Sequence, residues 1–511
     1  MARDPLKVFD GIGGPRRRGR VTALLIRGGV VVGVLVVALV GWSVYRSITS
    51  IDPVTLDVLG VEGQPVVGAA IAVNDDDVTT DAAGRGTLRF EAPAFLAVSA
   101  PGYHDATFEV AGLPADRALV LNLNPIILQG RVTTPDGTGV AGAEVVIGDR
   151  SVVTEEFGSF EFVAAVPGTV HVNKFAWEST EVEWSGDDGR LDVAMEPFTV
   201  RGLRVSGDAA GTPGQWNEIL DLAERSAVNS LVFDTKEESG TILYDTQVEA
   251  AVAAGARNPL YDPQALIAEA KERGFYTITR VVTFQDDFAA NALPDHAIHT
   301  PDGGLWTNDS NLSWLDPTDR QAWEYPISLA LEACELGFDE IQFDYVRFPT
   351  DGDITETIYD AGELDATVRV DTISGFLSTA KERINAAGCA VSADIFAIVM
   401  SVDDDQGLGQ MPDRLSFAVD AISPMIYPSH YGSGWLGFDT PNDHPSEVVG
   451  QALTAGVPKV TGGAVVRPWL QAFGYTGEQV LAQIDEAEQR SLGWLLWNAF
   501  SEFDLEMLPP E

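Results

Sequence analysis

The chain has 511 residues, which is too many for one hydrophobic core and predicts two to four domains. Its apolar content of 45% and charged content of 21% are those of ordinary globular proteins. The formal net charge is -44, from 32 Lys and Arg against 76 Asp and Glu. Such an excess of carboxylates argues against nucleic acid or an anionic lipid surface as a partner bound through a general electrostatic field.

An apolar run without any charge occupies residues 28–44. With its flanks it reaches the roughly 20 residues that span a bilayer. Five arginines lie between residues 16 and 27, and Asp52 follows the run, so the positive-inside rule places the N-terminus in the cytoplasm. A cleaved signal peptide is the alternative, although no small-x-small cleavage site follows the run cleanly. We expect residues 1–50 to be a basic tail and transmembrane anchor of a single-pass cell-membrane protein whose C-terminal domains are extracytoplasmic.

Residues 51–197 contain short alternating apolar runs broken by Gly, Pro and Asp, a pattern typical of β-sandwiches. The segment also repeats with a constant offset of 74, the first set being Gly68-Ala69, Thr80 and Gly84 and the second Gly142-Ala143, Thr154 and Gly158. We therefore predict two copies of one small β-sandwich domain, at residues 51–124 and 125–198. The phrase that begins Pro65-Val66-Val67-Gly68-Ala69 resembles the carboxypeptidase-regulatory-like domains of extracellular bacterial proteins.

From residue 199 the pattern changes to a strand followed by an amphipathic helix, repeated to the C-terminus. Eight candidate strands fit, at residues 200–206, 230–236, 276–284, 340–348, 390–398, 421–427, 459–466 and 492–499. Helical stretches are predicted between them, at residues 216–227, 263–273, 319–336, 366–387, 446–455 and 477–489. This order predicts an α/β domain, a (β/α)8 TIM barrel over residues 199–511.

Two carboxylates end neighbouring strands of this barrel. Alternation in the fourth strand puts Gln342 and Asp344 on one face, and in the fifth strand it does the same for Ser392 and Asp394. Strands lie about 4.8 Å apart, so the two aspartates should project side by side at the end where barrels carry catalytic groups. Retaining glycosidases use two carboxylates at roughly 5–5.5 Å. Asp344 could instead form an ion pair with Arg347 that holds the following loop.

Polar and aromatic side chains at the other strand ends would face the same opening. Sugar rings have apolar faces and hydroxylated rims, and such a mixed surface suits them. The residues predicted to bind substrate are Asp234, Lys236, Gln342, Tyr345, Arg347, Tyr427, His430, Arg467, Trp469, Trp497 and Glu502. We predict a polysaccharide or oligosaccharide as the partner.

Cysteine and histidine are scarce. Cys334 and Cys389 are the two cysteines, and either one disulfide or two buried thiols fits their surroundings. His296 and His299 have a spacing compatible with a metal, but no third ligand is evident. We predict no cofactor and no metal, and keep a metal-dependent hydrolase using these histidines and His430 as a minor alternative.

Four ordered motifs carry a resemblance that covers residues 198 to about 508. They are Phe343-Asp344-Tyr345-Val346-Arg347-Phe348-Pro349, Val391-Ser392-Ala393-Asp394-Ile395-Phe396, Ser423-Pro424-Met425-Ile426-Tyr427-Pro428 and Arg467-Pro468-Trp469-Leu470-Gln471. This part of the chain resembles a bacterial family of glycosyl hydrolases distantly allied to the α-amylase superfamily.

The resemblance implies a nucleophilic Asp at the end of strand four, where Asp344 stands. It also implies a Glu acid after strand five and an Asp after strand seven, but this chain has Asp394 and Arg467 there, and Gln342 where an Arg is usual. Glu502 and Glu237 are therefore alternatives to Asp394 as the acid/base.

Our leading hypothesis is a membrane-anchored glycoside hydrolase that cleaves a polysaccharide by a retaining two-carboxylate mechanism. A non-catalytic carbohydrate-binding or cell-wall scaffold protein is the alternative.

Overall fold

The computed structural model describes residues 38–40 and 51–510. The expected transmembrane run at residues 28–44 lies outside the described residues except for positions 38–40. Within the described ranges, no helix combines the length and the apolar character needed to cross a bilayer. The chain divides into two compact units, one of residues 1–128 with 163–166 and the other of residues 129–162 with 167–511.

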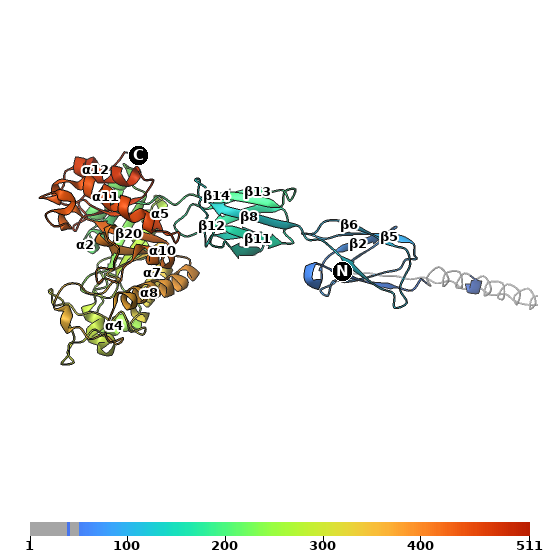
Figure 1. The fold of residues 1–511 in the computed structure, drawn as a ribbon, viewed down its shortest axis with the longest axis horizontal. Coiled ribbons are helices and arrows are strands. Elements are labelled where there is room, and N and C mark those ends of the chain that lie inside the picture. The colour runs from blue at the N-terminus through green and yellow to red at the C-terminus, as the bar shows by residue number, and fades with distance from the viewer. Residues whose placement is uncertain (1–37, 41–50, 511) are drawn as a thin grey trace, which may run out of the picture. The chain divides into compact units, whose positions relative to one another are not determined.

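The first unit contains a β-sandwich. Its strands are β1 (Val54–Leu59), β2 (Ala70–Val73), β3 (Asp76–Thr79), β4 (Arg85–Leu88), β5 (Ala94–Ser99), β6 (Ala106–Val110) and β7 (Ala118–Asn122). They form one sheet of order β4-β1-β7 and one of order β3-β2-β5-β6 (Figure 1). Alternate residues along β1 and β5 are buried, and one apolar cluster joins the two sheets.

The second unit begins with sheets of the same topology. Its strands are β8 (Ile127–Thr133), β9 (Glu144–Ile147), β10 (Arg150–Val153), β11 (Ser159–Val163), β12 (Gly168–Asn173), β13 (Thr180–Trp184) and β14 (Arg190–Ala194). The sheet orders β11-β8-β14 and β10-β9-β12-β13 repeat those of the first sandwich strand for strand.

A buried threonine explains part of the sequence repeat. Thr80 donates to the carbonyl of Val66 at 2.7 Å and accepts from the amide of Ala69 at 2.8 Å. Thr154 makes the equivalent two bonds in the second sandwich, at 2.7 and 2.9 Å. The repeated residues therefore form the same pair of local hydrogen bonds in both sandwiches. The likeness to carboxypeptidase-regulatory-like domains stays a prediction.

The remaining strands close into a parallel barrel, so the prediction of a TIM barrel is confirmed. They are β15 (Arg201–Val205), β16 (Ser230–Lys236), β17 (Tyr276–Val282), β18 (Glu340–Asp344), β19 (Ala390–Phe396), β20 (Ala421–Ile426), β21 (Val465–Val466), β22 (Trp469–Gln471) and β23 (Trp494–Trp497). Their order is β19-β18-β17-β16-β15-β23-β22-β20, and the pairing of β19 with β20 closes the ring. The short segments β21 and β22 both pair with β20 and share the seventh position.

Helices alternate with the barrel strands along the chain. They are α2 (Gly207–Gly211), α3 (Pro213–Glu224), α4 (Glu249–Ala254), α5 (Pro263–Glu272), α6 (Asp287–Ala292), α7 (Glu324–Leu336), α8 (Ala366–Ala386), α9 (Ile398–Ser401), α10 (Pro412–Ala418), α11 (Pro445–Gly456) and α12 (Gly477–Glu488). Figure 1 shows these helices gathered around the strands. One continuous apolar core lies between the barrel and its helices, while a much smaller apolar cluster, which includes Val232, Ile278 and Leu495, lies on the other face of the strands.

Two predicted strands differ from the observed ones by more than two residues at an end. The fourth ends at Asp344 instead of residue 348, because Tyr345 has a φ of 49° and turns the chain out of the extended conformation. The seventh was predicted at residues 459–466, but residues 460–464 form a Gly-containing loop after a 3-10 turn, and pairing is confined to Val465–Val466 and Trp469–Gln471. Pro468 cannot donate to a ladder, so it separates β21 from β22.

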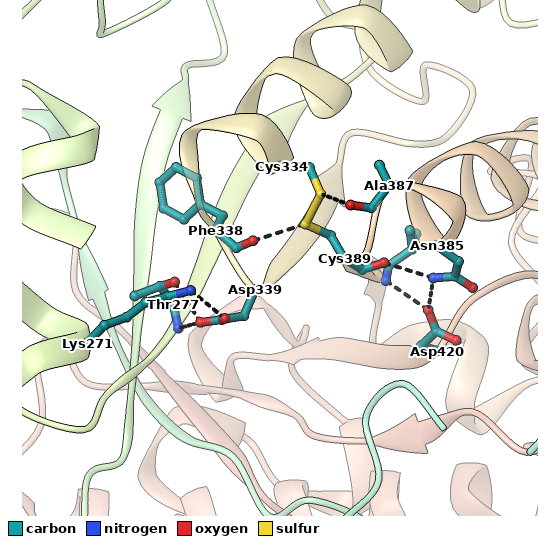
Figure 2. Close-up of a disulfide and its surroundings, with 10 residues drawn as sticks. Lys271, Thr277, Cys334, Phe338, Asp339, Asn385, Ala387, Cys389 and Asp420 are labelled. Atoms are coloured by element: carbon teal, nitrogen blue, oxygen red, sulfur yellow. Dashed lines mark hydrogen bonds and ion pairs between the residues drawn. A yellow bond between two sulfur atoms is a disulfide. The ribbon is translucent and has the colours of Figure 1, made fainter. Parts of the chain in front are cut away.

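A disulfide joins Cys334 in the last turn of α7 to Cys389 just before β19, with the Cα atoms 6.0 Å apart. The sequence left this pairing open. Figure 2 shows the bridge beside polar anchors at the same end of the barrel. Asp339 accepts from Lys271 at 2.6 Å and from the amide of Thr277 at 2.9 Å, and Asp420 accepts from Asn385 at 2.9 Å. These contacts tie together the N-terminal ends of the strands, the end of such barrels that serves stability.

Replacing both cysteines by Ala should destabilise the barrel. The bridge closes a loop with a sequence separation of 55, and a cross-link of this kind contributes about 2–4 kcal/mol. Urea unfolding followed by tryptophan fluorescence measures the loss. A reducing agent should lower the wild-type midpoint toward that of the double variant and leave the variant unchanged; equal midpoints for all samples would contradict the prediction.

Candidate active site

A cavity of about 520 Å³ opens at the C-terminal ends of the barrel strands. Its walls combine aromatic rings with charged groups, and the residues that line it include Glu238, Arg280, Asp344, Tyr345, Phe396, Met425, Tyr427, His430, Tyr431, Trp435 and Trp497. Five of the residues predicted for the site are in this set: Asp344, Tyr345, Tyr427, His430 and Trp497. A mostly apolar hollow with a few convergent polar groups is the usual form of a ligand site.

Asp344 is held at both of its carboxylate oxygens. Oδ1 accepts from the amide of Tyr345 at 2.6 Å. Oδ2 accepts from Nε and Nη2 of Arg280 at 2.9 and 2.6 Å. The side chain is only 5% exposed. Asp344 is therefore fixed in position while it still lines the cavity.

Arg280, at the centre of β17, connects three carboxylates. Besides Asp344, it contacts Glu238 at 2.6 Å and Asp234 at 3.3 Å. Its own side chain is 1% exposed, so all of these contacts lie in a poorly solvated environment. The guanidinium charge lowers the pKa of Glu238 to about 2. Glu238 consequently stays ionised at the cavity wall.

A second buried arginine extends the network around the barrel. Arg204 of β15 pairs with Asp234, which thereby bridges the two guanidinium groups. The Arg204 and Arg280 guanidinium carbons lie 4.1 and 4.9 Å from the centre of the Trp497 ring. Cation–π attraction of this kind adds to the ion pairs and orients the indole at the cavity wall.

Asp394 lies on β19, the strand next to Asp344, but it does not line the cavity. Its Oδ1 accepts from Nε1 of Trp469 at 2.8 Å, and its Oδ2 has no hydrogen-bond partner among the described residues. Burial, followed by the negative charge of Asp344, raises the pKa of Asp394 well above its ordinary value. The raised pKa favours the protonated form of the Asp394 carboxyl. Burial, followed by the charge of Asp394, also raises the pKa of the cavity residue Tyr427, whose hydroxyl likewise lacks a partner in the described chain.

Several residues predicted to bind substrate are buried in the barrel wall or interior. Gln342 donates to Ser423 at 3.1 Å, Lys236 pairs with Asp286 at 2.8 Å, and Arg467 pairs with Glu340. Asp234, Trp469 and Arg347 are buried as well, and none of these residues lines the cavity. The sequence pattern identified inward-facing positions, but it did not distinguish the packed interior from its open end.

Arg347 stabilises the aromatic wall instead of pairing with Asp344. Its guanidinium lies over the rings of Phe396, Trp314 and Tyr345 at 4.7, 5.0 and 5.1 Å. Phe396 and Tyr345 line the cavity on their other side. The ion pair that the sequence offered as an alternative for Asp344 is thus made by Arg280.

The alternatives for the acid/base occupy different places. Glu502 is exposed and lines a separate cleft. Glu237 is partly buried, and burial together with the charge of Asp234 raises its pKa. His296 pairs with Asp319 at 2.5 Å, and the described residues contain no group of three or more potential metal ligands.

Sequence reasoning missed Arg280 and Arg204 as members of the site, and it did not count Glu238 among the residues that bind substrate. A signal was present for the two arginines, because each is a charge inside a short, mostly apolar strand. Such a residue needs a buried carboxylate partner. Glu238 carried no such signal, since it follows a strand in a loop that is already acidic.

The model of the DUF4015 family, described as "Putative glycosyl hydrolase domain", matches residues 202–503. None of the curated proteins compared with the chain matches it. The alliance with the α-amylase superfamily stays a prediction.

Similar solved structures include a hypothetical protein from Ruminiclostridium thermocellum ATCC 27405, 32% identical, with 38% of this chain and 96% of that chain covered and a TM-score of 0.35. The glycoside hydrolase domain of PgaB (BpsB) from Bordetella bronchiseptica is 10% identical, with 59% of this chain and 95% of that chain covered and a TM-score of 0.43. The glycoside hydrolase domain of PelA from Pseudomonas aeruginosa is 11% identical, with 60% of this chain and 96% of that chain covered and a TM-score of 0.35.

Replacing Arg280 by Met should destabilise the barrel by about 3–5 kcal/mol, because three buried or partly buried carboxylates lose their shared counter-charge. Urea unfolding measures the change. Arg383→Met is the control, since Arg383 is 36% exposed where it pairs with Glu324, and exposed pairs contribute little. Equal effects of the two substitutions would contradict a special role for the buried network.

Replacing Asp394 by Asn should stabilise the protein increasingly as the pH rises. An Asp in the unfolded chain has a pKa near 3.8, and the pKa of folded Asp394 is raised above it. The free energy of unfolding of the wild type therefore falls as the pH rises from the unfolded pKa to the folded one. The Asn variant lacks this titration and should gain up to about 1.4 kcal/mol relative to wild type for each pH unit above about 4. Urea unfolding at several pH values measures the difference, and a constant difference would disprove the raised pKa.

Proposed function

The chain belongs to the DUF4015 family of putative glycosyl hydrolase domains, and from this premise we propose that it hydrolyses O-glycosyl bonds of a polysaccharide. The observation that carries the proposal is the cavity at the strand ends, where Asp344 lies among aromatic rings. Rings such as Tyr427 and Trp497 can stack on the apolar faces of sugars, while the carboxylate reaches the reacting centre. Carbohydrate binding without chemistry would require neither a clamped carboxylate nor a protonated neighbour.

The raised pKa of Asp394 is a shift in the direction that the acid of a retaining mechanism needs. Asp344 would attack the anomeric carbon, with both oxygens oriented by Arg280 and the Tyr345 amide. Asp394 would be the source of the proton for the leaving oxygen, and because it lies behind the cavity wall, the proton would pass through a group that lines the cavity. In the second half-reaction the deprotonated Asp394 would take a proton from the attacking water, so that protons balance over the cycle.

Other side chains would orient the sugar. Tyr345, Tyr427, His430 and Trp497 face the cavity and are the members of the predicted set that can touch a ligand. The buried polar residues, such as Gln342 and Arg467, would act indirectly by holding the strands and the reacting carboxylates in place.

We further propose that the protein acts outside the cytoplasm, anchored by the apolar segment at residues 28–44. The uncharged run with arginines on its N-terminal side motivates the anchor. The Cys334–Cys389 disulfide supports the location, because disulfides persist in oxidising compartments. A fusion of residues 1–60 to a topology reporter tests it, and a cytoplasmic reporter signal would rule it out.

The mechanism predicts different defects for the two aspartates. Asp344→Asn should abolish hydrolysis of every glycan that the wild type cleaves. Asp394→Asn should lower turnover of natural glycans about 10²–10⁴-fold, the usual contribution of a general acid, but should spare aryl glycosides whose leaving group needs no proton. Reducing-end assays and chromogenic substrates measure the two effects, and NMR of the first product should show retained anomeric configuration.

Asp371→Asn is the matched control, because Asp371 also pairs with an arginine, Arg414, but is 56% exposed and outside the cavity. If Glu237→Gln or Glu502→Gln shows the leaving-group dependence instead of Asp394→Asn, that residue is the acid/base. Unchanged turnover in Asp344→Asn removes the proposed mechanism. Glycan binding by wild type without any hydrolysis would favour the carbohydrate-binding scaffold.

A further inference from the structure

A second cleft, of about 970 Å³, lies beside helix α3 and the segments that follow β22 and β23. It has no place in the mechanism above. Its walls include Phe473, Asn498, Phe500 and Glu502. The segments after β22 and β23 leave the barrel at the C-terminal ends of its strands, and α3 runs from that end toward the other. The part of the cleft formed by these two segments therefore lies at the same end of the barrel as the catalytic cavity.

The cleft and the catalytic cavity share a wall. The ring of Phe473, which lines the second cleft, lies 6.0 Å from that of Tyr427 and 6.5 Å from that of His430, both of which line the cavity. Likewise Trp497 lines the cavity and the next residue, Asn498, lines the cleft. A chain-like ligand seated in the cavity can therefore continue into the cleft across these residues.

Phe500 is held with its ring exposed. The side chain is among the most exposed large apolar groups of the described chain, at 73%. Its backbone is nevertheless ordered by hydrogen bonds, because Oδ1 of Asn498 accepts from the amides of Phe500 at 2.9 Å and Glu502 at 3.3 Å. A rigidly presented aromatic ring in a cleft loses little conformational entropy when a sugar ring stacks on it.

The buried ion network supports the same loop. Arg204 donates to the carbonyls of Asn498 at 3.0 Å and Ala499 at 2.7 Å. The amide of Ser206 donates to the hydroxyl of Ser501 at 2.8 Å. The loop that carries Phe500 is thus bound to the arginine that shares Asp234 with Arg280.

The charges of the cleft restrict its ligand. Exposed carboxylates outnumber the single guanidinium of Arg225, and they belong to Glu218, Asp221, Glu502 and Asp504. An anionic polymer would be repelled by this surface, whereas an uncharged glycan would find hydrogen-bond acceptors for its hydroxyls.

We propose that the second cleft binds further units of the polysaccharide whose scissile bond lies in the catalytic cavity, with Phe500 as a stacking platform, and that the glycan is uncharged. This inference rests on the proposed function. It implies that the enzyme cleaves within a chain, because sugar units on both sides of the reacting bond would then be bound.

Binding measurements test the inference without relying on turnover. In full-length Asp344→Asn protein, calorimetry with uncharged oligomers of glucose and of N-acetylglucosamine should show affinity that rises from disaccharide to hexasaccharide in at least one series. Adding Phe500→Ala should weaken hexasaccharide binding about tenfold, equivalent to about 1.4 kcal/mol, and disaccharide binding much less. Phe417→Ala is the matched control, because Phe417 is 68% exposed but lines neither cavity.

The inference would be overturned if affinity did not depend on the length of the oligosaccharide, or if Phe500→Ala weakened binding of the disaccharide and the hexasaccharide equally. Tighter binding of oligogalacturonates than of the uncharged oligomers would also overturn it. Absence of binding in both series would do the same. A different result would contradict the proposed function: wild type that binds these glycans but releases no reducing ends from them. Where wild type does hydrolyse them, kcat/KM for Phe500→Ala should fall with the hexasaccharide far more than with an aryl monosaccharide, and early products should be internal fragments.

Discussion

The C-terminal domain depends on one buried interaction, the contact of Arg280 with Asp344, Glu238 and Asp234 inside the barrel mouth. Charges in such a poorly solvated place are costly unless each has a partner, and here one guanidinium serves three carboxylates. Arg204 adds a second positive charge to the same cluster through Asp234. The network places the Asp344 carboxylate at the cavity wall and gives it a counter-charge, so the stability of the barrel and the proposed function rest on the same atoms.

The two ends of the barrel differ in whether the contacts that stabilise them also border a cavity. At the N-terminal end of the strands, the Cys334–Cys389 bridge and the hydrogen bonds of Asp339 and Asp420 join neighbouring elements through groups that no cavity uses. At the C-terminal end, Arg204 and Arg280 also hold elements together, but their partners face or border the two openings. The contacts at the N-terminal end of the strands stabilise the barrel, and the C-terminal end carries the cavity with its aromatic rings.

The ionisation of Asp394 shows how a barrel interior creates chemistry from ordinary residues. Trp469 donates to one of its oxygens, and no described group pairs with the other. Burial, followed by the charge of Asp344 on the adjacent strand, disfavours a negative charge on Asp394 and raises its pKa. The difference between the two aspartates therefore comes from their neighbours, because their side chains are identical.

Much of the fold could be predicted from the sequence, because the alternation of a strand and the periodicity of a helix can each be read within a single segment. The strand at Ser230–Lys236 was predicted with its observed bounds. The seventh strand was not, because the stretch around Gly462 and Pro468 has apolar residues but no continuous ladder. Their position after the predicted seventh strand also assigned Arg467 and Trp469 to the barrel opening, although packing buries both.

The amino-acid sequence by itself determined the strand and helix order, the repeated sandwich pattern and the position of Asp344 at a strand end, because these follow from local periodicity and turn chemistry. Only the tertiary structure decided that Arg280 is the partner of Asp344, that Cys334 meets Cys389, and that Phe500 stands beside the catalytic cavity. Each of these contacts joins segments far apart in the chain. Their pairing depends on how the barrel closes, and no local pattern contains that information.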